Sequence, residues 1–324
     1  MNEQSDSETK ARLVAVPSNP IPEDGRVGFV DTPDGARLRY ARWQSTLRPT
    51  KGTVIILQGR AENIEKYLET VSDLRERGFG VLCFDWRGQG LSSRLLKDRL
   101  KGHIEHFDQY LTDLDTILSE IALPDCAGPF YLLGHSTGGL IATLAAPFLG
   151  NRVRRMVLIS PLFALRNLPV SQSLVQRVGA VLTFFGLGRL SVGWGGRALQ
   201  NHHFIGNRLT SDTTRFQRNA EILAEDQELR LSSPTVSWIF SACRAMEQVN
   251  DSEFLGTITI PTLMVAAGND PIVSPEHVEM LGHRMRSGAH LTIFGAKHEL
   301  LQERDVFREQ LLSAFDAFVP GTEV

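Results

Sequence analysis

The sequence predicts an α/β fold, a mostly parallel, doubly wound sheet with an inserted helical cap. Three observations predict it. Short apolar runs without polar alternation recur from residue 53 onward, as strands buried on both faces require. Segments long enough for a crossover helix separate most of these runs, which favours alternating β and α units. One connection, from residue 160 to residue 262, is far longer than a single crossover needs and predicts the insertion.

The first expected element is an antiparallel pair of strands. Residues 26–30 and 37–43 flank Asp34-Gly35, a dipeptide that signals a hairpin. The apolar runs that follow predict strands at 53–57, 80–84, 130–133, 153–159, 262–266 and 290–294. Crossover helices are expected over 64–77, 107–121, 138–149, 275–285 and 306–318. We therefore expect the hairpin at one edge of a buried parallel sheet.

The chain divides into four predicted parts. Residues 1–25 form a flexible N-terminal leader, residues 26–162 the first part of the core, residues 163–250 the helical cap, and residues 251–324 the second part of the core. Helix-like stretches within the cap cover 212–226 and 234–248. The insertion is rich in aromatic side chains, namely Phe184, Phe185, Trp194, Phe204, Phe216, Trp238 and Phe240. We expect this cap to lie over the carboxyl ends of the strands, where open α/β sheets place their ligands.

Composition excludes several classes of function. The 324 residues carry a net charge of −3, which provides no basic field for nucleic acid or an anionic membrane. The three cysteines are odd in number and widely spaced, so we expect small buried side chains and neither disulfides nor a metal site. No segment resembles a secretory signal or approaches the roughly 18 apolar residues of a membrane span. The expected location is the cytoplasm, and the oligomeric state stays open.

The most informative motif is Gly134-His-Ser-Thr-Gly138, which lies between an apolar run and a helical stretch. A G-x-S-x-G sequence between a strand and a helix is typical of a nucleophile elbow. The turn is so sharp that Gly134 and Gly138 must lack a Cβ atom. The helix that follows directs its free N–H groups at the reaction centre, which favours a developing anion. The motif predicts Ser136 as a nucleophile.

A serine hydroxyl needs an adjacent base that is held in one tautomer by a carboxylate. In folds with such an elbow, the chain order is Ser, then Asp or Glu, then His. Asp270 follows the predicted strand at 262–266, and His298 follows the last predicted strand. An alternative for Asp270 is a turn before Pro271 or a helix cap. The order and placement predict Asp270 as the acid and His298 as the base.

The other eight histidines are weaker candidates for the base. His135 lies inside the elbow and cannot reach the Oγ of its neighbour. The remaining seven are expected to be solvated on loops or helix surfaces: His103, His106, His202, His203, His277, His283 and His290. His202 and His203 resemble a metal pair, but no third ligand follows at a suitable spacing. We predict no metal site.

Two backbone N–H groups are expected to bind the oxyanion. One belongs to Thr137, directly after the nucleophile, and the other to Arg60, in the loop after the first parallel strand. Such donors stabilise the tetrahedral intermediate by about 3–4 kcal/mol each. The guanidinium of Arg60 has two interpretations, a partner for an anionic group of the substrate or a solvated surface side chain.

Five motifs together resemble the monoglyceride lipase and bacterial lysophospholipase group of α/β-hydrolases. They cover 58–63, 84–92, 134–139, 268–270 and 297–299, so the resemblance spans nearly the whole chain. It implies an α/β-hydrolase fold, hydrolysis of carboxylic esters of lipid-like alcohols without a cofactor, and a mobile cap around an apolar acyl tunnel. By the same resemblance, Ser136, Asp270 and His298 match the triad, and Arg60 and Thr137 match the oxyanion donors.

The sequence departs from the group at three positions. Gln58 and Asn63 stand where the group often has histidines, and Gln89 replaces another. None is a triad position, so the implied chemistry is kept, and the departures favour the bacterial lysophospholipase-like branch. The resemblance also implies bracing roles for Glu62 and Arg87 within their loops.

The primary hypothesis is a lysophospholipase or monoacylglycerol lipase that contacts a membrane surface transiently through its cap. A general short-chain carboxylesterase or thioesterase would use the same machinery in a smaller pocket. A peptidase of the proline iminopeptidase type shares the fold, but its elbow resembles G-G-S-W-G, which is absent here. A non-catalytic small-molecule receptor would tolerate an incomplete triad, and dehalogenases have an aspartate in place of Ser136.

Overall fold

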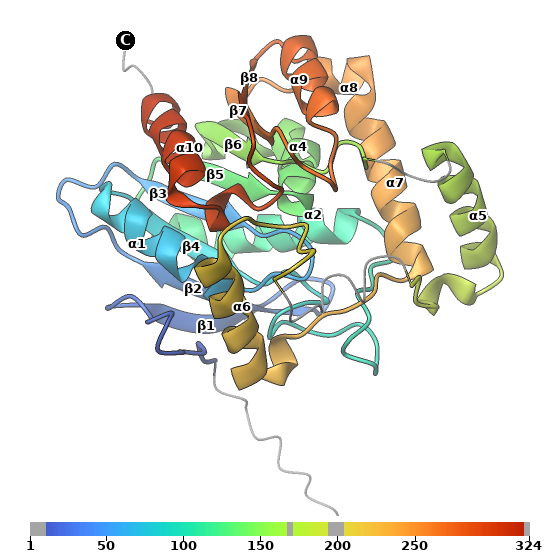
Figure 1. The fold of residues 1–324 in the computed structure, drawn as a ribbon, viewed down its shortest axis with the longest axis horizontal. Coiled ribbons are helices and arrows are strands. Elements are labelled where there is room, and N and C mark those ends of the chain that lie inside the picture. Colours follow the sequence, from blue (N-terminus) through green and yellow to red (C-terminus); the bar gives the residue numbers. More distant parts are fainter. Residues whose placement is uncertain (1–10, 167–170, 194–203, 321–324) are drawn as a thin grey trace, which may run out of the picture.

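The computed structural model describes residues 11–166, 171–193 and 204–320. Its centre is one sheet of eight strands in the order β1-β2-β4-β3-β5-β6-β7-β8 (Figure 1). The strands are β1 (Arg26–Asp31), β2 (Arg37–Trp43), β3 (Thr53–Leu57), β4 (Gly80–Phe84), β5 (Phe130–His135), β6 (Arg155–Ile159), β7 (Thr262–Ala267) and β8 (Gly288–Ile293). Strand β2 runs antiparallel to both of its neighbours, and the pairs from β4 to β8 are parallel. The predicted mostly parallel sheet is confirmed.

The hairpin forms where the sequence predicts it. Asp31 pairs with Arg37 at its closed end, and Gly35 has a φ of 85°. This left-handed conformation is accessible to glycine without a steric cost. The hairpin places β1 at one edge of the sheet.

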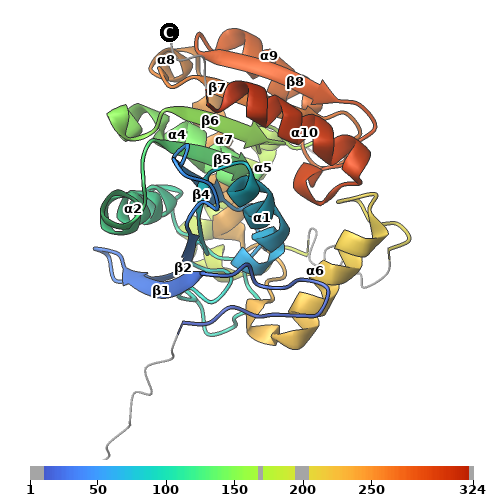
Figure 2. The ribbon, with the colours of Figure 1, turned by 90° about the vertical axis from the view of Figure 1, so that its left-hand side faces the viewer.

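Helices cover both faces of the sheet. They are α1 (Leu68–Glu76), α2 (Asp108–Thr116), α3 (Leu123–Asp125), α4 (Thr137–Leu149), α5 (Gln172–Phe184), α6 (Thr213–Glu225), α7 (Val236–Asn250), α8 (Ser252–Gly256), α9 (Pro275–Arg284) and α10 (Asp305–Phe318). Figure 2 shows α1 and α10 on one face and α2 and α4 on the other. Each of the five predicted crossover segments contains a helix, and α2 continues into a π-helical turn at Ile117–Ala122.

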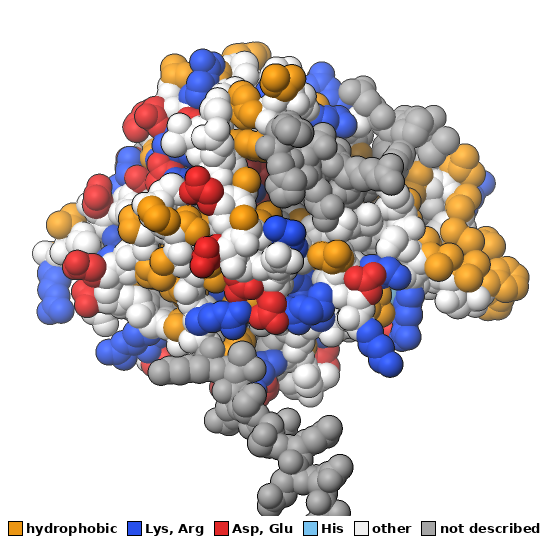
Figure 3. Space-filling view, turned by 60° about the horizontal axis from the view of Figure 1, so that its bottom comes forward, with side chains coloured by type: hydrophobic (Ala, Val, Ile, Leu, Met, Phe, Trp, Pro, Cys, Tyr) orange, Lys and Arg blue, Asp and Glu red, His pale blue; other side chains and the backbone are white. Residues whose placement is uncertain are grey.

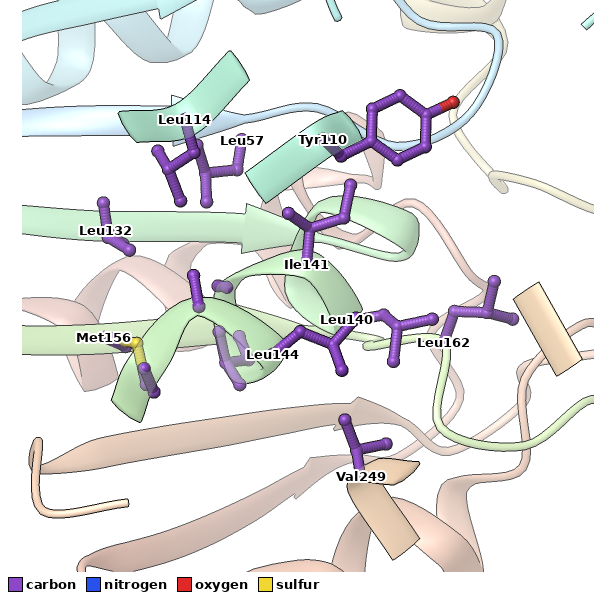
Figure 4. Close-up of a cluster of buried hydrophobic side chains, with 14 of the residues drawn as sticks. Leu57, Tyr110, Leu114, Leu132, Leu140, Ile141, Leu144, Met156, Leu162 and Val249 are labelled. Atoms are coloured by element: carbon purple, nitrogen blue, oxygen red, sulfur yellow. The ribbon is translucent and has the colours of Figure 1, made fainter. Parts of the chain in front are cut away.

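Each face of the sheet has its own apolar core. On one face, Leu57 and Leu132 from the strands meet Leu140 and Ile141 from α4, with Val249 of α7 nearby (Figure 4). All five side chains are at most 1% exposed. Burial of such a side chain stabilises the fold by about 1.5–3 kcal/mol. These contacts hold α4, the helix that begins directly after Ser136, against the sheet.

The last strand differs from the expected buried run. Side chains of β8 alternate between exposed and half-buried positions until Ile293, because β8 pairs only with β7 and forms the second edge of the sheet. Edge strands commonly have one solvated face. The apolar run over 290–294 therefore predicts the strand but not its exposure.

The long insertion between β6 and β7 contains α5, α6, α7 and α8. The stretches predicted at 212–226 and 234–248 correspond to α6 and α7, whereas the sequence did not predict α5 as a separate helix. Residues 167–170 and 194–203, which include Trp194, lie outside the described residues. No helix of the described part combines the length and apolar character that a membrane crossing requires. The division into a separate cap and core stays a prediction.

Part of the expected flexible leader is packed against the protein. Val14 and Val16 are each 7% exposed and cluster with Ile222 of α6. The guanidinium of Arg12 pairs with Asp226 at 2.6 Å, and Asn19 donates to the backbone of Glu65 at 2.8 Å. Residues 11–25 are therefore held by apolar burial and by hydrogen bonds, contrary to the expectation for this segment. Residues 1–10 lie outside the described residues.

Helix α6 is attached to the core by ion pairs. Arg215 and Arg218 both contact Glu69 of α1 at 2.6 Å. Arg215 also contacts Asp305, at the start of α10, at 2.8 Å. Since Glu69 accepts from both arginines, it connects the inserted segment to the face of the sheet that α1 covers.

Candidate active site

Ser136 lies at the turn between β5 and α4, as the elbow motif predicts. Its φ of 51° and ψ of −112° are strained for a residue with a side chain. The turn is held by a hydrogen bond from the Ser136 N–H to the carbonyl of Ile159 at 2.9 Å. A Cβ atom at Gly138 would lie 2.1 Å from the carbonyl oxygen of Leu57, and one at Gly134 would lie 3.0 Å from the backbone of Gly138. Both glycines are therefore required for the approach of α4 to the sheet.

The structure brings Ser136, His298 and Asp270 together, although they come from three separate segments. The Nε2 of His298 lies 3.1 Å from the Oγ of Ser136, and its Nδ1 lies 2.6 Å from Oδ2 of Asp270. The exposed fractions are 9%, 4% and 1% for Ser136, His298 and Asp270. This geometry matches the hydrogen-bonded arrangement that activates a serine.

Asp270 is positioned by its own loop. Its Oδ1 accepts from the backbone N–H groups of Ile272 at 2.8 Å and Val273 at 3.0 Å, so Oδ2 is left to face His298. Burial by itself would raise the pKa of Asp270, but the neighbouring His298 and these hydrogen bonds outweigh it and lower the pKa. Asp270 is therefore ionised at neutral pH, as the orienting acid must be. A role for Asp270 in a turn or a helix cap alone would explain the hydrogen bonds to Oδ1, but it would not explain the contact of Oδ2 with His298.

The two expected oxyanion donors lie beside Ser136. Thr137 is the first residue of α4, and Arg60 lies in the turn after β3. Neither of their backbone N–H groups donates to an acceptor within the described part of the chain. Both residues line the same cavity as Ser136 and His298. Their amides are thus available to a developing oxyanion.

The loop that carries Arg60 is held by Gln89. The side-chain amide of Gln89 donates to the carbonyls of Gly59 at 2.9 Å and Glu62 at 3.1 Å, and it accepts from the Ala61 N–H at 3.2 Å. Gln89 is 3% exposed. Although Gln89 departs from the family motif, its side chain therefore braces the oxyanion loop.

A buried network of charges supports the other side of the loop. Glu62 accepts from Lys66 at 2.8 Å and contacts the Nδ1 of His135 at 3.0 Å, and Lys66 also contacts Glu299 at 2.6 Å. Burial opposes the ionised form of Glu62, but Lys66 and His135 outweigh it and hold the pKa of Glu62 well below its usual value. Burial likewise opposes the protonated form of His135, yet Glu62 raises the pKa of His135. The predicted bracing role of Glu62 accounts for these contacts.

The bracing role expected for Arg87 is also seen. Its guanidinium pairs with Asp113 at 2.7 Å and with Asp34, and the Arg87 side chain is 2% exposed. The pairs connect the loop after β4 to α2 and to the hairpin turn. Arg87 thus acts within the protein and not on a substrate.

Sequence reasoning missed two supporting residues, Lys66 and Arg166. Lys66 follows Glu62 at i+4, a spacing that brings opposite charges together on a helical turn and could have indicated the pair. Arg166 donates from Nη1 to the backbone carbonyl of Asp270 at 2.7 Å. No local pattern signals this contact, because the two residues are far apart in the sequence.

Ser136 opens into a cavity of about 380 Å³, which we call the catalytic cavity. This volume is within the range of about 300–1,000 Å³ that is typical of ligand sites. Its apolar wall includes Leu162, Leu165, Val175, Trp238, Ile239, Ala242, Cys243 and Met246. Most of these side chains come from α7 and its surroundings. A larger cavity of about 1220 Å³ lies beside the hairpin and contains none of the triad residues.

Among the aromatic residues of the insertion that the structure describes, Trp238 is the one that lines the catalytic cavity. Phe184 and Phe185 are instead 86% and 71% exposed at the end of α5. The aromatic content of the insertion therefore predicts apolar surface as well as pocket wall, and sequence alone does not separate the two.

The expectation of solvated histidines is wrong for His103. It is 5% exposed, and its Nδ1 lies 2.9 Å from the Oγ1 of Thr235, because the loop it occupies is covered by the start of α7. Glu279, His283 and His290 form the one trio among the described residues whose ligand atoms could meet on an ion. This trio lies on α9 and β8 and shares no residue with the catalytic cavity. His202 and His203 lie outside the described residues.

Comparison with known proteins agrees with this geometry. The family model described as serine aminopeptidase, S33, matches residues 48–305. The lysophospholipase L2 of Escherichia coli K12 is 33% identical over 300 residues, which is 88% of this chain and 84% of that protein. The probable lysophospholipase L2 of Haemophilus influenzae is 30% identical over 82% of this chain and 83% of its own length. The chain belongs to the S33 family of α/β-hydrolases.

Solved structures support the same fold. A thermostable carboxyl esterase from Bacillus coagulans superposes with a TM-score of 0.75 at 20% identity, covering 93% of this chain and 99% of that one. A soluble variant of the monoglyceride lipase of Saccharomyces cerevisiae gives a TM-score of 0.72 at 18% identity, covering 90% and 94%. The predicted α/β-hydrolase fold is confirmed. We therefore interpret the geometry of Ser136, Asp270 and His298 as that of a member of the S33 family.

Proposed function

We propose that the protein hydrolyses carboxylic esters of lipid-like substrates through an acyl-enzyme on Ser136, without a cofactor. The observation that supports this most directly is the continuous hydrogen-bonded series from Asp270 through His298 to Ser136 at one end of an apolar cavity. Two free backbone amides lie beside the nucleophile, from Arg60 and Thr137. Together these groups supply each part that acyl transfer to serine needs.

The reaction follows from the placement of these groups. The Oγ of Ser136 attacks the ester carbonyl while Nε2 of His298 takes its proton, and the amides of Arg60 and Thr137 stabilise the oxyanion. His298 then gives the proton to the departing alcohol, which leaves an acyl group on Ser136. Water, deprotonated by His298, attacks this acyl group and releases the carboxylic acid. Asp270 stays ionised and stabilises the imidazolium in both steps.

The lipid-like substrate is inferred from the wall of the catalytic cavity and from the names of the relatives. The lining side chains from α7, together with Leu162, Leu165 and Val175, are apolar and suit an acyl chain. Relatives that match most of this chain are named lysophospholipase L2, and a rat relative that matches 54% of it is named monoglyceride lipase. A general short-chain esterase would need fewer of these apolar wall residues, because its acyl group is smaller.

An aminopeptidase activity, which the family description names, would require a free carboxylate for the substrate amine. Among the residues that line the catalytic cavity, the acidic ones are Glu62 and Glu299. Both are within 2.8 Å of Lys66, and Glu62 also contacts His135. Because their charges are already compensated, the geometry favours ester hydrolysis.

We also propose that the inserted segment contacts a membrane surface transiently. Exposed apolar side chains gather on α5 and the turn after it, namely Leu174, Val178, Val181, Phe184, Phe185, Leu187 and Leu190. Figure 3 shows these hydrophobic side chains at the right of the molecule, where Figure 1 places α5. A contiguous apolar surface of this kind is typical of an interaction site, and a lipid surface is where a lipid substrate is found.

The test compares purified protein with the Ser136→Ala variant on four substrates: a lysophosphatidylcholine, a monoacylglycerol, a short-chain nitrophenyl ester and an aminoacyl nitroanilide. Release of fatty acid from the two lipids by the wild type but not by the variant is the expected result. Turnover of the short ester alone would replace the lipid substrate with a general esterase. Turnover of the anilide alone would overturn ester hydrolysis in favour of a peptidase.

A further inference from the structure

A second cavity lies on the other side of the oxyanion loop from the catalytic cavity. Its volume is about 540 Å³, and we call it the polar cavity. Arg60, Glu62, Leu209 and Glu299 line both cavities, so the two meet at the loop that carries the oxyanion donor. The polar cavity is thus adjacent to the place where an ester would react at Ser136.

The charges in the polar cavity are unevenly compensated. Its carboxylates have partners, because Glu62 and Glu299 contact Lys66 and Glu228 contacts Arg12 at 2.9 Å. The three arginines of its lining, Arg60, Arg99 and Arg230, form no ion pair with a carboxylate of the described residues. Backbone carbonyls accept from them instead: Ser232 from Arg60, Glu228 from Arg99 at 3.4 Å, and Leu223 from Arg230 at 2.8 Å. Three positive charges are therefore available to an anion.

Arg60 is the least well satisfied of the three. Its Nε is shielded from solvent and has no hydrogen-bond partner, and its guanidinium lies 5.5 Å from the centre of the Trp238 ring. Burial lowers the pKa of Arg60 to about 10, so the side chain remains charged at neutral pH. A buried donor without an acceptor is costly unless a ligand supplies one.

An unpaired acceptor lies in the same cavity. Oδ1 of Asn219, on α6, is buried and has no donor, while its Nδ2 contacts Gln302 at 3.3 Å. The polar cavity thus presents one unsatisfied acceptor besides the donors of Arg60. This pattern fits a ligand that carries both an anionic group and a hydroxyl group.

We propose that the polar cavity is a headgroup subsite, in which Arg60, Arg99 and Arg230 bind the phosphate of a lysophospholipid and Asn219 accepts from a headgroup hydroxyl. The proposal rests on the proposed ester hydrolysis at Ser136 and adds the alcohol part of the substrate to it. Guanidinium groups suit phosphate because they donate two parallel hydrogen bonds to its oxygens. Arg60 connects the two functions, since its amide faces the oxyanion and its side chain faces the phosphate.

The test uses two substrates that differ only in the phosphate, oleoyl glycerol and oleoyl lysophosphatidic acid, in micelles of a neutral detergent. The measured quantity is the ratio of kcat/KM for the phosphorylated substrate to that for the neutral one. Arg99→Gln and Arg230→Gln each remove one charge, and we expect each to lower the ratio about tenfold. Asn219→Asp keeps the side-chain size but adds a negative charge that repels the phosphate. We expect it to lower the ratio by more than either arginine variant does. Arg154→Gln, an exposed arginine outside both cavities and outside the apolar surface of α5, is the matched control and should leave the ratio unchanged.

The outcomes separate this proposal from the proposed function. If the wild type cleaves both substrates and no variant changes the ratio, the headgroup subsite is wrong and ester hydrolysis stands. If the wild type cleaves neither, the proposed function fails first. Inorganic phosphate is the remaining probe: competitive inhibition of lysophosphatidic acid cleavage, weakened in Arg230→Gln, supports the subsite when the ratio also falls. If inorganic phosphate inhibits but the variants leave the ratio of kcat/KM values unchanged, the cavity binds free phosphate, and the proposed headgroup subsite is wrong.

Discussion

The catalytic centre and the inserted segment hold their polar and apolar groups in different ways. Around Ser136, buried polar groups are joined by short hydrogen bonds: Asp270 has three partners, and Glu62 is shared by Lys66 and His135. In the insertion, α5 leaves Phe184 exposed at its end, while α6 is attached to the core by ion pairs. The comparison indicates that the chemistry requires fixed geometry, whereas the insertion combines one anchored helix with one open apolar surface.

The largest expected effect is on catalysis and comes from Asp270→Asn. An amide keeps the size of the side chain but cannot stabilise the imidazolium and favours the wrong tautomer of His298, so we expect kcat to fall by about 10⁴-fold. Initial rates on a nitrophenyl ester measure this loss, with circular dichroism as the check on folding. Asn269→Ala, one residue away, is the control and should retain most of the rate. A loss below about tenfold in Asp270→Asn would remove this residue from the triad.

The second prediction concerns the buried network beside the oxyanion loop. Glu62→Gln keeps the shape of the side chain but removes the charge that faces Lys66 and His135, and we expect the free energy of unfolding to fall by about 3 kcal/mol. Urea unfolding at neutral pH measures it. The control is Asp316→Asn, which breaks a surface pair with Arg77 in which Asp316 is 46% exposed and should cost at most about 1 kcal/mol. Equal losses in the two variants would show that burial adds nothing to the network.

Asp270 and Glu62 also show how much of the site could be predicted from the sequence. Ser136, Asp270 and His298 were predictable because the elbow motif, the chain order and the strand ends all constrain them locally. The network around Glu62 was predictable only in part. The i+4 spacing indicates the pair of Glu62 and Lys66, but Lys66 meets Glu299 only after the chain has folded, and no spacing between residues 66 and 299 signals that contact. Likewise the aromatic content of the insertion does not reveal that Phe184 is exposed, because its tertiary surroundings decide its exposure.

The third prediction concerns the anchor of α6. Burial opposes the ionised form of Glu69, but the hydrogen bonds and charges of Arg215, Arg308 and Arg218 outweigh it and lower the pKa of Glu69 to about 2. A carboxylate whose pKa is lowered by folding contributes stability above its unfolded pKa of about 4.3, and the contribution is lost as the pH falls through the folded pKa. Glu69→Gln should therefore cost about 2–3 kcal/mol at pH 7.

Urea unfolding at several pH values measures this contribution. The difference between wild type and Glu69→Gln should stay constant from neutral pH to about pH 5 and then shrink between pH 4 and pH 2. Glu76→Gln, at the end of the same helix and without an ion pair among the described residues, provides the matched control and should show little difference at any pH. A difference that persists unchanged at pH 2 would mean that Glu69 acts through packing and not through its charge.

The smallest expected effect on the enzyme itself comes from the open surface of α5. Phe184→Ser combined with Phe185→Ser should reduce binding to phosphatidylcholine vesicles roughly 100-fold or more, because each phenylalanine that enters the lipid contributes roughly 1.5 kcal/mol or more. The rate on a soluble nitrophenyl ester should stay within twofold, since neither side chain lines the catalytic cavity. Phe148→Ser, at a 68% exposed position on α4, is the matched control and should leave vesicle binding unchanged. Because the contact is apolar, added salt should not weaken it; binding that salt abolishes, or that the α4 variant reduces equally, would contradict a role for α5.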